Sequence, residues 1–191
     1  MRVSVLTTGN EIHRARNLVY KVFVLEQGWM IPQNPTQLCV EKDELRDAYD
    51  PVATWFGAFE GDTLIACFRT CGRLHGYFEL EHYHPVPDFI KQSDSAIEGT
   101  RLAVRKEYRS SPAVFELVRF AFSHLLERSC EFFFATGFFP RPGVLYARRF
   151  GLMRYGEPFR YDAQDPNQVF LFFADRDRLK KTVETLTGIL G

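Results

Sequence analysis

A carboxylate and a guanidinium lie close together in the segment Glu98-Gly99-Thr100-Arg101. The flanking residues predict a strand over Ala96–Val104, in which Glu98 and Thr100 lie on one face because side chains alternate. Arg101 points to the other face unless a bulge intervenes. Glu98 and Arg101 are therefore the first polar residues considered as part of a site.

A second arginine, Arg69, directly follows the apolar run Leu64–Phe68. An unpaired buried charge is very costly, so Arg69 needs an acidic partner. The segment upstream supplies a cluster of carboxylates, which either holds a substrate ammonium or is a solvated acidic loop. Structural pairing and substrate binding both stay open for Arg69. The acidic residues are Asp43, Glu44, Asp47 and Asp50.

A basic turn follows the predicted strand, at Arg105, Lys106 and Arg109. A helix is predicted over residues 113–129, and its N-terminus lies next to this turn. Backbone N–H groups and cations together bind phosphate well, so the turn is a candidate phosphate site. The alternative is a solvated basic loop.

Aromatic residues are the unusual part of the composition, with 19 Phe, 8 Tyr and 2 Trp among 191 residues. Phe23 and Trp29 lie six apart across the predicted end of the first helix. There they either wall a pocket or pack in the core beside a glycine cap at Gly28. The later phenylalanines either line an apolar tunnel or fill the core. The candidate tunnel residues are Phe115, Phe122, Phe133 and Phe138.

Hydrophobic periodicity predicts the elements that must position these side chains. A long loop is predicted between the first helix and the second strand, over Met30–Pro51. The predicted helices are Glu11–Leu25, Ala113–Ser129, Pro142–Phe150 and Asp175–Leu190. The predicted strands are Arg2–Thr7, Thr54–Glu60, Thr63–Leu74 with a continuation through Tyr77–Leu80, Ala96–Val104, Glu131–Thr136, Met153–Tyr161 and Gln168–Ala174.

This alternation predicts an α/β fold with a mixed sheet, built as one domain over residues 1–191. Lys+Arg and Asp+Glu both number 24, so no global field favours nucleic acid or an anionic membrane. The four cysteines form no CxxC pair and are interpreted as free thiols. His82 and His84 lack a third ligand at metal spacing, so no metal site is predicted. The polar N-terminus and the absence of a long apolar run lead us to expect a cytoplasmic protein without a membrane span.

Five pieces of the chain, in order, resemble one family. They are Phe23-x5-Trp29, Asp47-Ala48-Tyr49-Asp50, Phe68-Arg69, Glu98-Gly99-Thr100-Arg101 and Tyr146-Ala147-Arg148-Arg149-Phe150-Gly151-Leu152. Together they are similar to the acyl-homoserine-lactone synthases and the related N-acyl amino acid synthases of the GCN5-related N-acyltransferase (GNAT) superfamily. The resemblance covers roughly Arg16 to Phe159. As in that family, the usual GNAT pyrophosphate loop is missing after Tyr108-Arg109.

The resemblance implies a GNAT-like fold and transfer of an acyl chain from a phosphopantetheine thioester to a primary amine. The donor would be an acyl carrier protein or acyl-CoA, with no bound cofactor, and the acceptor an amino acid or S-adenosylmethionine. By matching position, Phe23 and Trp29 would cover the amine. The polar network around the cleft would comprise Asp47, Asp50, Arg69, Glu98 and Arg101. The resemblance makes Glu98 and Arg101 the candidate catalytic residues, since a carboxyl group in a half-buried strand beside an apolar cleft is expected to have a raised pKa, which suits a general base.

Backbone N–H groups around Leu102–Val104 are candidate donors to the oxyanion, because a strand that splays from its neighbour frees them. Lactone synthases carry an arginine where this chain has Val19, four residues before Phe23. A free amino acid or another amine is therefore an alternative acceptor to S-adenosylmethionine. Two rival interpretations are a generic acyl-CoA-dependent GNAT enzyme acting on a small amine and a non-catalytic α/β ligand-binding protein.

Overall fold

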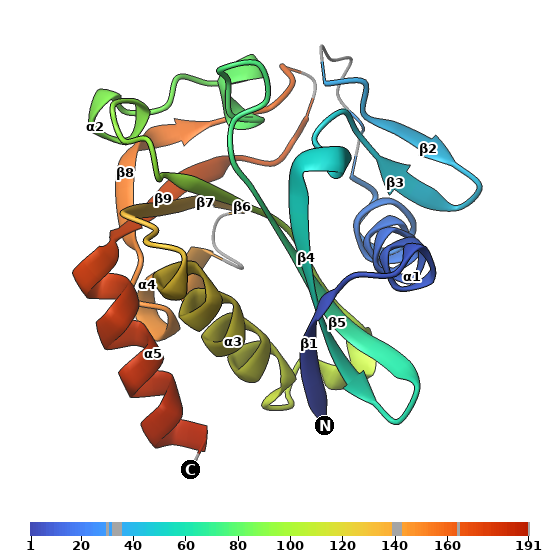
Figure 1. The fold of residues 1–191 in the computed structure, drawn as a ribbon. Helices are drawn as coiled ribbons and strands as arrows, with labels where there is room; N and C mark the ends of the chain where they lie inside the picture. The colour runs from blue at the N-terminus through green and yellow to red at the C-terminus, as the bar shows by residue number, and fades with distance from the viewer. Residues whose placement is uncertain (30, 32–35, 139–142, 164, 191) are drawn as a thin grey trace.

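A seven-stranded sheet forms the centre of the protein, in the order β1-β4-β5-β6-β7-β9-β8 (Figure 1). The structure is a computed structural model that describes residues 1–29, 31, 36–138, 143–163 and 165–190. All pairings within the sheet are antiparallel except that of β6 with β7. The strands are β1 (Arg2–Leu6), β4 (Ala53–Glu60), β5 (Thr63–Cys71), β6 (Ile97–Val104), β7 (Phe132–Phe138), β8 (Met153–Phe159) and β9 (Val169–Asp175). The predicted mixed α/β fold is confirmed.

Helices cover both faces of the sheet (Figure 1). Helix α1 (Gly9–Val19) packs on one face with the core around Leu18, Trp55 and Phe59, while α3 (Ala113–Glu127) and α5 (Arg176–Leu190) pack on the other. Thr8 begins α1 through a reciprocal capping box with Glu11, which satisfies two of the free N–H groups of the first turn. Two shorter helices complete the fold, α2 (Asp88–Lys91) and α4 (Gly143–Arg149).

The parallel contact between β6 and β7 is short. It pairs Ile97–Gly99 with Phe133–Ala135, and both strands continue for several residues beyond it. Gly99 is required at this contact, because a Cβ there would lie 2.3 Å from the Phe133 ring. After the contact the two strands diverge, which opens the middle of the sheet.

The predicted loop over Met30–Pro51 is wrong in part, because it contains a small hairpin of β2 (Cys39–Glu41) and β3 (Glu44–Arg46). Its turn residues Lys42 and Asp43 both have positive φ, at 52° and 60°. Tight hairpins favour this geometry, but it is usually marked by Asn-Gly or Asp-Gly, so the sequence carried no hairpin signal.

Two element boundaries also differ from the predictions. The third strand ends at Cys71 and does not continue through Tyr77–Leu80, where Leu80–His82 forms a 3₁₀ helix instead. The first helix changes from α to π winding over Tyr20–Glu26. Helical periodicity does not distinguish these two windings over two turns. No helix among the described residues is long and apolar enough to cross a bilayer.

Candidate active site

A cavity of about 450 Å³ lies where β6 and β7 diverge. Its wall includes Thr100–Leu102 of β6 and Thr136–Phe138 of β7, the residues immediately beyond the short parallel contact. The volume lies within the range of about 300–1,000 Å³ that is typical of small-molecule sites. One end of the cavity carries charged side chains, and the other is lined by aromatic and aliphatic ones.

The charged end is backed by a buried network centred on Arg69, whose side chain is 1% exposed. Its Nη1 donates to Asp47 Oδ1 at 2.8 Å and to Asp50 Oδ1 at 3.0 Å, and its Nη2 donates to Glu79 at 2.5 Å. Its Nε donates to the Thr100 hydroxyl at 2.9 Å. The predicted pairing of Arg69 with the upstream carboxylates is therefore present. Arg69 does not line the cavity, and neither Asp47 nor Asp50 does.

Arg101 lies on the cavity wall because a bulge interrupts the strand. The β5–β6 register shifts between Cys67 and Arg69, and Arg101 has a φ of 56°. Its Nη2 donates to Asp47 at 2.8 Å and to Glu79 at 2.6 Å. Within the described residues, its Nε and Nη1 have no hydrogen-bond partner, so they are available to a ligand. The bulge thus brings Arg101 to the same cavity as Glu98 and Thr100.

Glu98 is buried in the cavity wall and 3% exposed. The Leu80 N–H donates to its Oε2 at 3.2 Å, the one hydrogen bond to this carboxyl within the described residues. Burial and the nearby charge of Glu79 raise the pKa of Glu98 to about 8, while the Leu80 N–H and the two guanidiniums oppose that rise. A carboxyl group with such a pKa exchanges its proton near neutral pH.

Glu79 holds the two arginines together, and the sequence analysis missed it. It is 6% exposed, lines the cavity and bonds to both Arg69 and Arg101. Two buried arginines on adjacent strands require more than one carboxylate, which is the signal that would have prompted a search downstream of β5 as well as upstream. The pKa of Asp47 is driven well below its usual range by Arg69 and Arg101, in spite of its burial.

Phe23 in the π-helical turn and Trp29 just after it lie on the cavity wall and also pack in the core with α1, so both alternatives for this pair are present. Their rings pack edge to face with centroids 5.9 Å apart, and the backbone N–H of Trp29 donates to the Phe23 carbonyl at 2.8 Å. The Arg101 guanidinium lies 5.7 Å from the Trp29 ring centroid. Trp29 Nε1 is buried and has no hydrogen-bond partner within the described residues. These two rings therefore border the charged end of the cavity.

The apolar end of the cavity is continuous with the core between the sheet and α3. Of the predicted tunnel residues, Phe122, Phe133 and Phe138 line it, whereas Phe115 does not and packs on Phe150, 6.1 Å between ring centroids. Leu102 lines the cavity, whereas Val104 does not. Further apolar lining residues are Phe68, Val118, Tyr146, Phe150, Leu152 and Val169.

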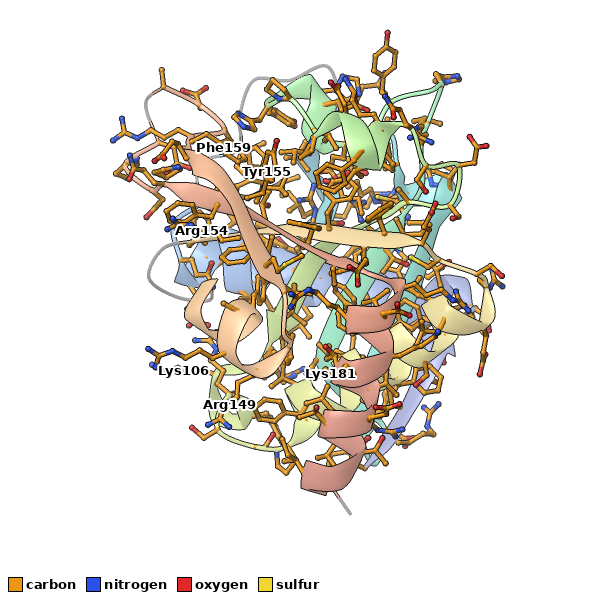
Figure 2. The ribbon with its side chains drawn as sticks, turned by 90° about the vertical axis from the view of Figure 1, so that its left-hand side faces the viewer. Lys106, Arg149, Arg154, Tyr155, Phe159 and Lys181 are labelled. Atoms are coloured by element: carbon orange, nitrogen blue, oxygen red, sulfur yellow. The ribbon has the colours of Figure 1, made fainter. Side chains whose placement is uncertain are left out.

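The basic turn lies outside this cavity. Arg109 forms a paired salt bridge with Glu26 and also donates to the Val104 carbonyl, while the Arg105 Nε donates to the Leu64 carbonyl at 2.8 Å. Lys106 is exposed and has no hydrogen-bond or salt-bridge partner within the described residues. In the view of Figure 2, Lys106 and Arg149 are labelled at the lower left, and Lys181 lies to their right on α5. The cations of the turn are thus unequal, because two of them have protein partners.

The histidine pair is not part of a cluster that could hold a metal, and no such cluster occurs among the described residues. His82 Nε2 lies 3.0 Å from the Tyr49 hydroxyl, and His84 stacks on Phe159 with ring centroids 3.8 Å apart.

A sequence profile of the family described as "N-acyl amino acid synthase FeeM" matches residues 14–175 of the chain. The chain belongs to the FeeM family. It is accordingly an acyltransferase, and the interpretation as a non-catalytic binding protein is set aside. No curated protein sequence matches the chain.

Solved structures agree with the FeeM-family fold. FeeM, an N-acyl amino acid synthase from uncultured soil microbes, superposes with a TM-score of 0.70 at 14% identity over 95% of this chain and 93% of that chain. BjaI, a CoA-dependent acyl-homoserine lactone synthase solved with SAM and isopentyl-CoA, gives 0.69 at 14% identity, over 92% and 82%. TofI, solved with an inhibitor and MTA, gives 0.69 at 19% identity, over 98% and 97%.

Proposed function

We propose that this FeeM-family enzyme transfers an acyl chain from the thioester of CoA or an acyl carrier protein to the α-amino group of an amino acid or of S-adenosylmethionine. One observation carries the proposal: a single cavity joins a charged end, suited to an amino acid headgroup, to an apolar end, suited to an acyl chain. The names of the neighbours support both halves, since they include an N-acyl amino acid synthase and a lactone synthase bound to SAM and an acyl-CoA.

Glu98 is the proposed general base. An amine attacks a thioester only in its neutral form, so the ammonium must first lose a proton. With a pKa of about 8, Glu98 is mostly protonated at pH 7, and its ionised fraction takes up that proton. The amine nitrogen then forms a bond to the thioester carbonyl carbon, the C–S bond breaks, and the thiolate leaves and is protonated. No bound cofactor is required, because the two substrates supply all the atoms of the amide product.

Arg101, not Arg69, is the proposed ligand of the acceptor's carboxylate. Nη1 of Arg69 is used by Asp47 and Asp50 and its Nη2 by Glu79, whereas Arg101 keeps Nε and Nη1 available at the cavity wall. Each of these groups can donate a charge-assisted hydrogen bond to a carboxylate oxygen. Asp47 and Glu79 both accept from Nη2 of Arg101 and so orient its guanidinium.

Val19 does not decide between the two acceptors. It is fully buried in the core under α1, while Arg16, one helical turn earlier, reaches Asp50 at 3.1 Å. The helix therefore still supplies a cation to the acidic segment, from a different position. Because Val19 lies in the core and not on the cavity wall, it removes no charge from the entrance.

Lys106 is the proposed contact to the donor outside the cavity, with Arg149 labelled near it in the view of Figure 2. An acidic carrier protein or the phosphates of CoA would complement these cations. Arg105 and Arg109 contribute less in this proposal, because Leu64 and Glu26 already engage them.

The test offers the purified protein a long-chain acyl-CoA and the matching acyl carrier protein, each with S-adenosylmethionine, the common amino acids and simple alkylamines. Mass spectrometry then identifies the products. The proposal predicts amide formation on acceptors that carry an α-carboxylate and none on alkylamines. Products from alkylamines alone would contradict it and favour the generic GNAT interpretation. Added salt should raise the KM of an acidic donor, because exposed charges are screened over about 10 Å at 0.1 M.

A further inference from the structure

One short turn, residues 79–83, contacts the charged end of the cavity at three points. Glu79 binds both buried guanidiniums, and the Leu80 N–H donates to Glu98 at 3.2 Å. Tyr83 lines the cavity, and its hydroxyl lies 3.0 Å from the Thr36 hydroxyl. The position of this turn therefore decides which groups face the proposed base.

His82 of the same turn makes one further hydrogen bond, to Tyr49. The Tyr49 hydroxyl is 2.9 Å from the Tyr77 carbonyl and 3.0 Å from His82 Nε2. Since the hydroxyl has a single proton, which the carbonyl accepts, His82 Nε2 is assigned as the donor to the Tyr49 oxygen. The Tyr49 ring is 1% exposed and packs edge to face on the His82 ring, with centroids 6.0 Å apart.

Tyr49 belongs to the segment that carries the other carboxylates. Its backbone N–H donates to Asp47 Oδ1 at 2.9 Å. The contact between Tyr49 and His82 therefore ties the segment of Asp47 to the turn of Glu79, and both carboxylates bind Arg69 and Arg101. Neither Tyr49 nor His82 lines the cavity, so neither can touch a substrate there.

We propose that Tyr49 and His82 are positioning residues for the acyl transfer, because their hydrogen bond fixes the turn 79–83 and so keeps the Leu80 N–H on Glu98. The inference rests on the proposed role of Glu98 as the base. A hydrogen bond to a carboxylate favours its charged form, so loss of the Leu80 contact should make Glu98 harder to ionise. Turnover would then need a higher pH. The titratable and charged groups that face Glu98 are Glu79, Arg69, Arg101, Cys71, Tyr49 and Tyr161.

Tyr49→Phe removes only the hydroxyl, and His82→Leu removes the donor from the less buried side of the bond. Two readouts are measured on the full chain. The first is the pH profile of kcat/KM, whose acidic midpoint should move up by roughly half a unit to one unit in both variants. The second is the Leu80 amide by NMR, which should exchange roughly 2- to 10-fold faster. The pH midpoint of its chemical shift, which reports Glu98 ionisation, should move with the kinetic midpoint.

Matched controls separate positioning from general weakening of the fold. Tyr155→Phe makes the same chemical change as Tyr49→Phe at an exposed position and should leave both readouts at wild-type values. His82→Gln, which keeps an N–H donor, should restore most of the shift lost in His82→Leu. If Tyr49→Phe and His82→Leu leave the Leu80 amide and its midpoint unchanged, the positioning role is overturned. If wild-type protein acylates no acceptor while the amide readout responds as expected, the proposed function fails and the structural link stands.

Discussion

The two ends of the cavity are built on different principles. At the charged end, segments far apart in the chain meet through named bonds: Asp47 and Asp50 before β4, Arg69 in β5, Glu79 in a turn and Arg101 in β6. At the apolar end, rings from α3, β7 and α4 pack against one another. Removing one member of a buried charged set leaves the others unpaired, whereas an apolar wall tolerates a change of shape. A single substitution at the charged end should therefore destabilise the fold strongly, and we call that end brittle. The apolar end should accept changes in side-chain volume, and we call it adjustable.

Charge balance sharpens this contrast. The three carboxylates of Asp47, Asp50 and Glu79 face the guanidiniums of Arg69 and Arg101, and Arg16 adds a third cation 3.1 Å from Asp50. These three cations balance the three carboxylates without Glu98, and Glu44, which also lies 3.6 Å from Arg16, is paired with Arg46 at 2.9 Å. Burial, with the added charge of Glu79, raises the pKa of Glu98 to about 8, so a carboxylate at Glu98 would be a surplus buried charge. An acceptor that arrives as an ammonium would supply the missing counter-charge.

Glu98→Gln is expected to have the largest effect on catalysis. Loss of a positioned general base typically costs about 10²–10⁴-fold in rate. Stability at pH 7 should not fall, because folding of the wild type must take up a proton at Glu98 there, whereas glutamine needs none. Steady-state kinetics and urea unfolding on the same samples check the activity and the stability. Unchanged turnover in the folded variant would remove Glu98 from the mechanism.

Arg69→Met tests the brittleness of the charged end in the fold itself. The change leaves Asp47, Asp50 and Glu79 short of a buried partner, and breaking such a pair costs about 3–5 kcal/mol. The measurement is the free energy of unfolding in urea. Arg178→Met, at an exposed arginine, should be nearly neutral. Equal values for the two variants would show that the network adds no stability.

The sequence predicted the apolar end and the fold better than it predicted the charged end. Helical periodicity places Val118 and Phe122 on the buried face of α3, and an apolar run marks Phe133 as buried in β7. Burial of this kind can be predicted because it follows from the spacing of apolar residues along the sequence. The pairing of Arg69 was also predictable, since a charge inside an apolar strand must be neutralised. Whether that charge binds substrate depends on which of its donors remain free, which only the three-dimensional contacts show.

Arg101 and Glu79 show why the rest was not predictable. Strand alternation places Arg101 on the face opposite Glu98, and the bulge that overrides it has no glycine to mark it, since Arg101 itself takes the positive φ. Glu79 lies in a turn without regular periodicity, ten residues after Arg69. Pairing between such positions is set by how the chain returns to the sheet, a long-range property.

The free energy of unfolding, measured against pH for the wild type and for Glu98→Gln, isolates the contribution of the Glu98 carboxyl group. Its pKa is raised above the unfolded value, so between about pH 4.5 and 8 the folded state holds a proton that the unfolded state has lost. Its contribution to stability is fully present below that window and is lost as the pH rises through it, by at most about 1.4 kcal/mol per pH unit. Wild-type stability relative to Glu98→Gln should therefore fall from pH 5 to 8 while wild-type activity rises. Taking the difference cancels the histidines, which the variant retains. A flat difference would mean that Glu98 is ionised throughout.

Val118→Ala is the mildest test and addresses the adjustable end. Val118 lines the cavity from α3 and is 2% exposed, so its truncation enlarges the space beside Phe122 and Phe133. The preference of the enzyme should move toward longer acyl chains, with stability lowered by about 0.5–3 kcal/mol. Competition between thioesters of different chain length, read by mass spectrometry, measures the shift. Val183→Ala makes the same change on α5, against the core but away from the cavity, and should lower stability without altering chain preference. If both variants keep the wild-type preference, the acyl chain does not reach Val118, and the apolar end serves as core packing at that depth.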